Sequence, residues 1–156
     1  MKGNEKIIAL LNNLLADELT AISQYMVHSE MCANWDFKKL HEHNEKRAID
    51  EMKHAEKLIG RILFLEGQPV VSQLNKINIG ASVEAQLKSD LDAEADAIKA
   101  YNDGIRQCIE LGDHGSRELI EDNLEDEEEH LDWLETQLDQ INQMGLQNYL
   151  LAQVKE

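Results

Sequence analysis

The chain repeats one set of acidic and histidine residues at an offset of 76 positions. The set and its copy are Glu18, Glu51 and His54, followed by Glu94, Glu127 and His130. The same offset relates other positions, since it pairs Leu11 with Leu87 and Tyr25 with Tyr101. An offset shared by polar and apolar residues indicates two equivalent helical hairpins, each carrying half of one site.

The spacing within each copy places these residues on the inner faces of helices. Glu51 and His54 are three residues apart, so they project from one helix face. Glu18 belongs to a stripe at positions 11, 15, 18, 22 and 25, which has the spacing of a buried face. A buried carboxylate is costly unless it is paired, protonated or bound to a cation. The alternative, solvated carboxylates on charged helices, does not explain why acids interrupt leucine-rich faces.

Four carboxylates and two imidazoles would meet if the four helices packed into one bundle. This donor set can hold two metal ions, with Glu51 and Glu127 bridging them. The terminal ligands would be Glu18 with His54 at one ion and Glu94 with His130 at the other. Mixed donors with open positions suit iron or manganese, whereas a structural zinc site would usually recruit cysteine. The sequence therefore predicts a dinuclear centre for iron or manganese.

Composition narrows the class of protein. With 15 basic and 31 acidic residues, the formal charge of −16 disfavours binding to nucleic acid or anionic membranes and suits cations. The length of 156 residues suits a single domain, 1–156. No apolar run approaches the roughly 18 residues that span a bilayer, and the N-terminus lacks the apolar core of a secretion signal. We therefore expect a cytoplasmic protein in which Cys32 and Cys108 are free, buried thiols.

The hydrophobic pattern predicts an all-α fold. The expected helices cover residues 5–33, 37–65, 83–110, 116–144 and, as a short fifth helix, 146–153. Asn4 can cap the first and Asp36 the second, while Ser82 or Ser116 can cap the later helices. The connection 66–81 can reach about 50 Å, enough to run along a helix of about 42 Å. The second and third helices can therefore be parallel, as in a ferritin-like four-helix bundle with one long crossover.

Three residues near the expected centre have open roles. Tyr25 follows Glu18 by seven residues on the same stripe, so it can hydrogen-bond a ligand carboxylate or supply an electron during oxygen reduction. Asp50 and Asp126 directly precede the bridging glutamates. They can orient metal ligands or lie as exposed charges on the helix surface.

Several longer runs carry a family resemblance. They are Met1-Lys2-Gly3, Ile49-Asp50-Glu51-Met52-Lys53-His54-Ala55, Arg61-Ile62-Leu63-Phe64-Leu65-Glu66-Gly67, Asp132-Trp133-Leu134-Glu135-Thr136 and Met144-Gly145-Leu146-Gln147-Asn148-Tyr149-Leu150. Through these runs and the paired ligands, the chain resembles the bacterioferritins, the haem-containing branch of the ferritin family. The resemblance covers nearly the whole chain.

The resemblance implies iron storage with ferroxidase activity. Fe(II) would be oxidised by dioxygen or hydrogen peroxide, and the ferric mineral would be kept in a homo-oligomeric shell of 24 subunits built from dimers. It also implies haem b or a related porphyrin shared between two subunits, with Met52 of each as an axial ligand. A ferredoxin-type electron donor would serve the release of iron. Met52 follows Glu51, so a helix turns it about 100° from the metal face.

One pair of residues departs from the family pattern. Lys46 and Arg47 stand where many members have a histidine and an acid, so we assign no inner-surface iron site to position 46. Two alternatives stay open, namely a passive cage that binds haem and iron, and a small di-iron oxidase or peroxidase of rubrerythrin type. The absence of a Cys-x-x-Cys pair argues against the second alternative.

Overall fold

The computed structural model describes residues 1–154, so the last two residues of the expected domain lie outside the described part. Five helices make up this part: α1 (Glu5–Asn34), α2 (Lys38–Phe64), α3 (Val83–Glu110), α4 (His114–Met144) and α5 (Leu146–Gln153). No strand occurs in residues 1–154. The all-α prediction is confirmed, and the predicted helix bounds differ from these by at most two residues.

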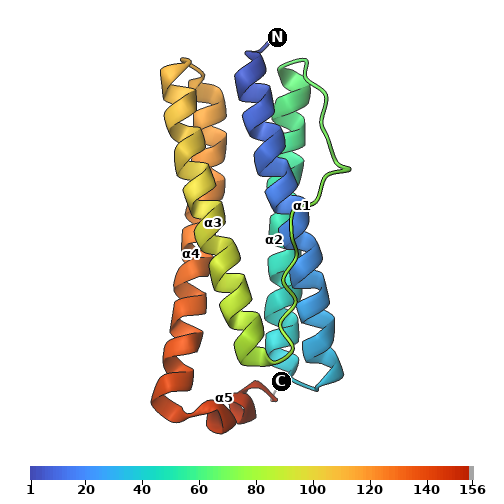
Figure 1. The fold of residues 1–156 in the computed structure, drawn as a ribbon, viewed down its shortest axis with the longest axis vertical. Coiled ribbons are helices and arrows are strands. Elements are labelled where there is room, and N and C mark those ends of the chain that lie inside the picture. The colour runs from blue at the N-terminus through green and yellow to red at the C-terminus, as the bar shows by residue number, and fades with distance from the viewer. Residues whose placement is uncertain (155–156) are drawn as a thin grey trace.

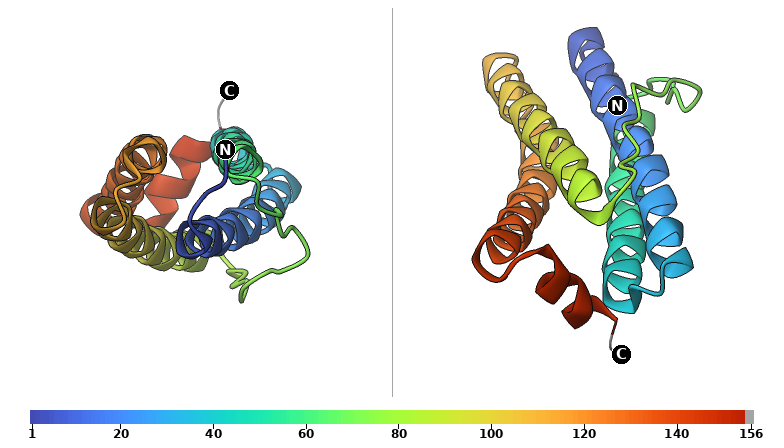
Figure 2. Two further views of the ribbon diagram at one scale, coloured as in Figure 1. Left: turned by 90° about the horizontal axis from the view of Figure 1, so that it is seen from above. Right: turned by 60° about the horizontal axis from the view of Figure 1, so that its bottom comes forward.

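Helices α1 and α2 form one antiparallel hairpin and α3 and α4 form the other (Figure 1). The connection between α2 and α3 runs along the bundle, so these two helices are parallel, as predicted. The short helix α5 turns across the end of the bundle (Figure 2). This is a four-helix bundle with one long crossover.

The core consists of two apolar clusters, one toward each end of the bundle. The first includes Leu11, Leu15 and Ile120, and the second includes Leu40 and Leu134. On each long helix, buried polar residues separate the apolar residues of these clusters. The bundle therefore has a polar layer at mid-height between two apolar ends.

Two of the predicted helix caps are confirmed. Asn4 accepts a hydrogen bond from the Lys6 backbone at 2.8 Å, and Ser82 accepts one from the Ala85 backbone at 3.2 Å. Each side chain satisfies a backbone N–H in the first turn that has no partner within its helix. The first and third helices are thus fixed at their N-terminal ends as the sequence predicts.

The predictions for the other two caps are wrong. Asp36 adopts a left-handed backbone with φ of 62° and is one position too early, because Phe37 precedes α2 and makes no side-chain cap in the described structure. Helix α4 begins earlier than predicted, and its cap is Asp113, which accepts from the Ser116 backbone at 3.0 Å. Ser116 donates its own hydroxyl to Asp113 at 2.7 Å, so it supports the cap instead of forming it.

The crossover is tied to α1 by side chains that accept its backbone N–H groups. Thr20 accepts from Asn75 at 2.8 Å, and His28 Nε2 accepts from Gly80 at 3.0 Å. The other ring nitrogen of His28 lies 3.0 Å from Asp90 on α3, and both side chains are buried. Because Nε2 is an acceptor, Nδ1 carries the proton and donates to Asp90.

Helix α5 buries one of its apolar residues within the subunit. Tyr149 is fully buried and donates to Gln137 at 2.6 Å. It packs in the second apolar cluster, with Leu40 and Leu134, because α5 folds back across the end of the bundle. Leu151 and Val154 remain exposed.

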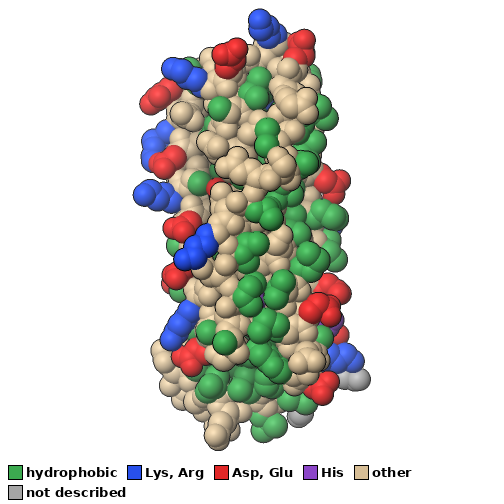
Figure 3. Space-filling model, turned by 45° about the vertical axis from the view of Figure 1, so that its right-hand side comes forward, with side chains coloured by type: hydrophobic (Ala, Val, Ile, Leu, Met, Phe, Trp, Pro, Cys, Tyr) green, Lys and Arg blue, Asp and Glu red, His purple; other side chains and the backbone are tan. Residues whose placement is uncertain are grey.

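Both cysteines are free and buried, as predicted. None of the helices in residues 1–154 combines the length and the apolar character needed to span a bilayer. Figure 3 shows apolar side chains running down one face of the molecule, with charged side chains mainly to either side.

Candidate metal centre

The polar layer brings all six predicted metal ligands to the middle of the bundle. They are Glu18 from α1, Glu51 and His54 from α2, Glu94 from α3, and Glu127 and His130 from α4, and all six are buried. The 76-residue offset thus becomes a spatial relation in which each hairpin contributes three side chains.

One half of this layer is assembled as a compact donor set. Glu18, Glu51, His54 and Glu127 each offer one ligand atom, and these atoms lie within 4.8 Å of one another. His54 Nδ1 lies 3.2 Å from Glu127 Oε1 and 3.5 Å from Glu18 Oε2. Three carboxylates and one imidazole therefore surround a single point.

The acids beside the bridging positions have different roles. Asp126 Oδ2 lies 2.9 Å from Nε2 of His54, so it orients the ring whose other nitrogen faces the carboxylates. Asp50 instead accepts a hydrogen bond from Lys46 at 3.2 Å. Of the two open roles, Asp126 has the orienting one and Asp50 pairs with a surface cation.

The other half holds an arginine that sequence reasoning did not place there. Nη2 of Arg47 lies 2.5 Å from Glu51 Oε1, 2.7 Å from Glu127 Oε2 and 3.6 Å from Glu94 Oε1. Its side chain is 6% exposed. His130 completes this half, with Nε2 3.9 Å from Glu94 Oε1. A visible signal was available, because Arg47 lies one turn before Glu51 on the same helix face.

The unpaired polar atoms of the layer test whether these residues suit a metal ion. Glu18 Oε2, Glu94 Oε2 and His130 Nε2 are buried and have no hydrogen-bond partner within the described structure. A buried polar atom without a partner is costly, and most such atoms in proteins are satisfied. Carboxylate and imidazole donors that converge without partners fit divalent iron or manganese.

Two glutamates of the layer favour the neutral form. Burial, together with the charges of Glu51 and Glu127, raises the pKa of Glu18 well above its usual value. Burial and the charge of Glu127 likewise raise the pKa of Glu94. Both acids would lose a proton when they bind a metal ion.

The remaining charges of the layer compensate one another. Burial alone would raise the pKa of Glu127, but hydrogen bonds with Glu94 and His54 lower it below its usual range. Burial alone would lower the pKa of His54, but hydrogen bonds with Glu127 and other carboxylates raise it. The charges of Glu51 and Glu127 likewise outweigh burial and raise the pKa of Arg47. The neighbouring carboxylates thus favour the charged forms of both His54 and Arg47.

His130 has the opposite character to His54. Burial, and then the charge of Arg47, lowers the pKa of His130 to about 2. Its ring lies nearly parallel to those of His43 and Trp133, at centroid distances of 5.3 and 5.8 Å, and these two rings stack on each other at 3.4 Å. A neutral imidazole with an unpaired Nε2 has the lone pair that metal binding requires.

Comparison with known proteins gives one consistent result. Residues 8–144 match the model of the ferritin-like domain. The chain is 42% identical to a bacterioferritin of Rhodobacter capsulatus over 97% of its own length and 94% of that protein. It is 41% identical to one of Mycobacterium tuberculosis, covering 96% and 94%, and 40% identical to one of Brucella melitensis, covering 96% and 92%. The chain belongs to the bacterioferritin family.

As a bacterioferritin family member, the chain also presents a methionine outside its bundle. Met52 is 46% exposed and lines a hollow of about 340 Å³ between α1 and α2. The apolar part of the lining includes Ile22, Met26 and Ile49. An exposed thioether in an apolar hollow fits a flat apolar ligand such as a porphyrin, while the assignment of Met52 to haem stays a prediction.

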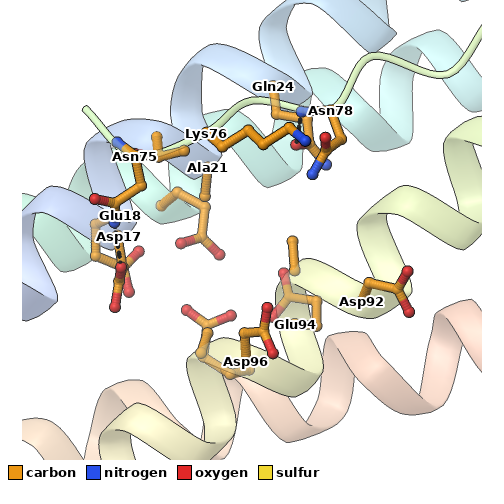
Figure 4. A pocket seen from close by; sticks show the side chains of 15 residues that line it. Asp17, Glu18, Ala21, Gln24, Asn75, Lys76, Asn78, Asp92, Glu94 and Asp96 are labelled. Carbon is orange, nitrogen blue, oxygen red and sulfur yellow. Dashed lines mark hydrogen bonds between the residues drawn. The ribbon is translucent and has the colours of Figure 1, made fainter.

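A second cavity, of about 380 Å³, opens beside the metal centre and is drawn in Figure 4. Glu18 and Glu94 lie at its inner side, and Asp17, Asp92 and Asp96 add further carboxylates to its lining. Burial raises the pKa of Asp17 to about 6, because its effect outweighs that of the hydrogen bond from Asn75, which alone would lower the pKa. The cavity is an acidic approach to the centre from the side that the crossover covers.

Proposed function

We propose that the chain is an iron-storage protein with ferroxidase activity. Fe(II) would be oxidised to Fe(III) at a dinuclear centre within each subunit, and ferric mineral would be stored in a hollow homo-oligomeric shell of 24 subunits built from dimers. The observation that carries the proposal is the buried layer of converging donor atoms without partners. Membership of the bacterioferritin family supports iron storage.

In this proposal the substrate ions bind between Glu51 and Glu127, with Glu18, His54, Glu94 and His130 at the ends. Each Fe(II) loses one electron, and dioxygen or hydrogen peroxide accepts the two electrons together. Acidic ligands favour the product, because they stabilise the higher charge of Fe(III). Two adjacent ions allow a two-electron reduction, so no one-electron-reduced oxygen species needs to be released.

The proposal includes haem between paired subunits. Met52 of each subunit would hold haem b or a related porphyrin through its thioether sulfur. When bound, this group would supply electron transfer between a ferredoxin-type donor and stored ferric iron. The cytoplasm is the proposed location of this exchange.

The proposal can be tested by adding Fe(II) anaerobically to the metal-free protein and then admitting oxygen. We expect a fast rise in ferric absorbance that saturates at about two iron ions per chain, because the bundle supplies two sets of terminal ligands. A counterpart with Glu51 changed to Ala should lack this phase. Slow oxidation at the rate of free Fe(II), without saturation, would contradict the proposal.

One observation favours a second candidate, a passive cage that binds iron and haem without useful oxidation. Arg47 lies among three of the four ligands expected at the second ion, which leaves only the first half assembled. The same oxygen experiment separates the candidates, since a passive cage would show no fast phase.

A further inference from the structure

The two halves of the metal centre differ at one buried position that the repeat makes easy to identify. The residue 76 positions after Arg47 is Asn123, and each precedes a bridging glutamate by four residues. Asn123 is fully buried and donates to the Tyr101 hydroxyl at 3.2 Å. The offset thus places a cation in one half and a neutral amide in the other.

We infer that Arg47 occupies the second metal position of the metal-free centre and makes metal loading sequential. The first divalent ion binds among Glu18, Glu51, His54 and Glu127, while the second binds only when the guanidinium of Arg47 withdraws. The inference rests on the proposed dinuclear centre and concerns the order and strength of metal binding there.

The first step of the argument is the position of the guanidinium. A metal ion held by Glu51, Glu94 and Glu127 would have to lie where their oxygens converge. Nη2 of Arg47 lies 2.5 to 3.6 Å from one oxygen of each of these residues. An ion and the guanidinium cannot share this space, because both are cations bound to the same oxygens.

The second step is the chemistry of arginine. A guanidinium offers donors only and keeps its proton in proteins, so it cannot become a metal ligand as a histidine can. Arg47 must therefore move for the second ion to bind, and its ion pairs with Glu51 and Glu127 must break. Breaking a buried ion pair is costly, so the second ion binds more weakly than the first.

The third step is a place to which Arg47 can withdraw. A second hollow, of about 360 Å³, is lined by Arg47 itself. Asp126 and Glu129 also line it, as does Asp50, which already pairs with Lys46. Because Arg47 contacts the glutamates of the centre and also lines this hollow, a change of its side-chain torsions is the movement that we infer.

Asn123 explains why the first half needs no such movement. Its amide is held by Tyr101, whose hydroxyl donates to Glu18 at 2.6 Å. Arg47 contacts only Oε1 of Glu51 and Oε2 of Glu127, while the other oxygen of each carboxylate faces His54, which is itself a ligand. The first ion can therefore bind to these oxygens without displacing Arg47. The two halves therefore have the same ligand types and differ in one neighbouring residue, which is Arg47 on α2 and Asn123 on α4.

The test is an anaerobic titration of the metal-free assembled protein with Co(II), followed by visible absorbance and calorimetry. We expect two binding steps per chain in the natural protein, the second at least about tenfold weaker than the first. Arg47→Asn copies the residue of the other half and should bring the two affinities to within about threefold. Lys57→Asn removes an exposed cation of α2 that lines neither the acidic cavity nor the hollow lined by Arg47, and it should leave the tenfold difference unchanged.

Two further variants are needed, one as a control for misfolding and one to identify the weak step. Arg47→Gln removes the charge with a smaller loss of volume, and circular dichroism reports whether either Arg47 variant keeps its helices. Glu94→Gln retains Arg47 but removes a ligand of the second ion, so it should abolish the weak step and spare the strong one.

Each outcome decides a different point. Two equal steps in the natural protein would overturn the role of Arg47 and leave the ferroxidase proposal intact. One ion in the natural protein and two in Arg47→Asn would show a permanent block and overturn withdrawal. A single ion in both proteins would overturn the inference together with the proposed dinuclear centre.

Discussion

The hydroxyl of Tyr25 on α1 donates a hydrogen bond of 2.6 Å to Oε1 of Glu94 on α3. The repeat inverts this contact, since Tyr101 on α3 donates to Glu18 on α1 at the same distance. Tyr25 thus makes a hydrogen bond to a predicted ligand carboxylate, while its role in oxidation stays a prediction. These crossed bonds join the two hairpins on either side of the metal layer.

Replacing Tyr25 by Phe should lower the free energy of unfolding of the metal-free protein by about 1–2 kcal/mol, because a buried carboxyl group loses its donor. We expect rapid Fe(II) oxidation to persist, since the side chain positions a ligand. Chemical denaturation and stopped-flow absorbance measure the two effects. Tyr149→Phe is the control, because it removes a similar bond to Gln137 far from the metal layer. A loss of the fast phase in Tyr25→Phe alone would instead show a redox role.

The bridging glutamates should be required for oxidation. We expect Glu51→Ala and Glu127→Ala each to abolish the fast phase of Fe(II) oxidation while helical content is retained. Normal rapid oxidation in both variants would exclude the bridging assignment. Circular dichroism and the oxygen experiment provide the two measurements.

Two of the predicted ligands, Glu127 and Glu18, should differ in their effect on the stability of the protein without metal. Glu127 neutralises both Arg47 and His54, so Glu127→Gln should destabilise the protein by about 3 kcal/mol. Glu18 has a raised pKa and one oxygen without a hydrogen-bond partner, so Glu18→Gln should change stability by less than about 1 kcal/mol. Chemical denaturation of both variants at one protein concentration tests the contrast. Equal losses would show that Glu127 carries no special charge role.

Haem binding should depend on Met52 and not on the neighbouring thioether. Met52→Leu keeps apolar volume but removes the sulfur, so we expect loss of bound haem with normal initial iron oxidation. Met26 lines the same hollow and is 53% exposed, which makes Met26→Leu a matched control that should retain haem. The natural protein should carry one haem per two chains. Full haem with an unchanged spectrum in Met52→Leu would exclude Met52 as the ligand.

Assembly should depend on the exposed part of α5. Deleting all residues after Gly145 is expected to open the proposed shell. The deletion would also remove Tyr149 from the second apolar cluster and so destabilise the bundle. Leu151 is 68% exposed, so Leu151→Asp should reduce the assembled mass seen by light scattering while thermal stability of the bundle changes little. Leu151→Met is the control. An unchanged large assembly in Leu151→Asp would show that this residue lies outside the subunit contacts.

The Asp113 cap should make stability depend on pH. Burial alone would raise the pKa of Asp113, but hydrogen bonds from Ser116 and the ion pair with Arg61 lower it. Its contribution is therefore present above the unfolded pKa of about 3.9 and is lost as pH falls through the folded value. Asp113→Asn should be less stable than the natural protein near pH 6 and converge with it once the pH has fallen below the lowered pKa of Asp113. Glu118→Gln, an exposed change on the same helix, should show little of this convergence.

The repeat explains why so much of the fold and site was predictable. A shared 76-residue offset fixes which helices pair, and the spacing of Glu51 and His54 fixes which face turns inward. The place of Arg47 in the centre was not predicted, because the repeated pattern consists of residue types that bind metal ions and an arginine is not one of them. Comparing position 47 with Asn123 in the sequence would have shown that the halves are not equivalent.

The errors at the helix ends have a different cause. Asp36 and Ser116 are good capping residues by type, but the chain reverses within a few residues and backbone geometry decides which one precedes the helix. The burial of Tyr149 was not predictable, because sequence periodicity describes a helix face and not the direction in which a short helix leaves Gly145. Gly145 has φ of 83°, and this turn sends α5 across the bundle.

The attachment of the crossover to α1 has a consequence for how ions enter. Asn12 accepts from Val70 at 2.9 Å and Gln24 accepts from Asn78 at 3.1 Å, in addition to the bonds from Asn75 and Gly80. The crossover, which forms one side of the acidic cavity, is therefore tied to α1 at several points along its length. We expect the passage to work as a fixed electrostatic filter, in which the charge of an approaching ion, and not the opening of a loop, sets the rate of entry.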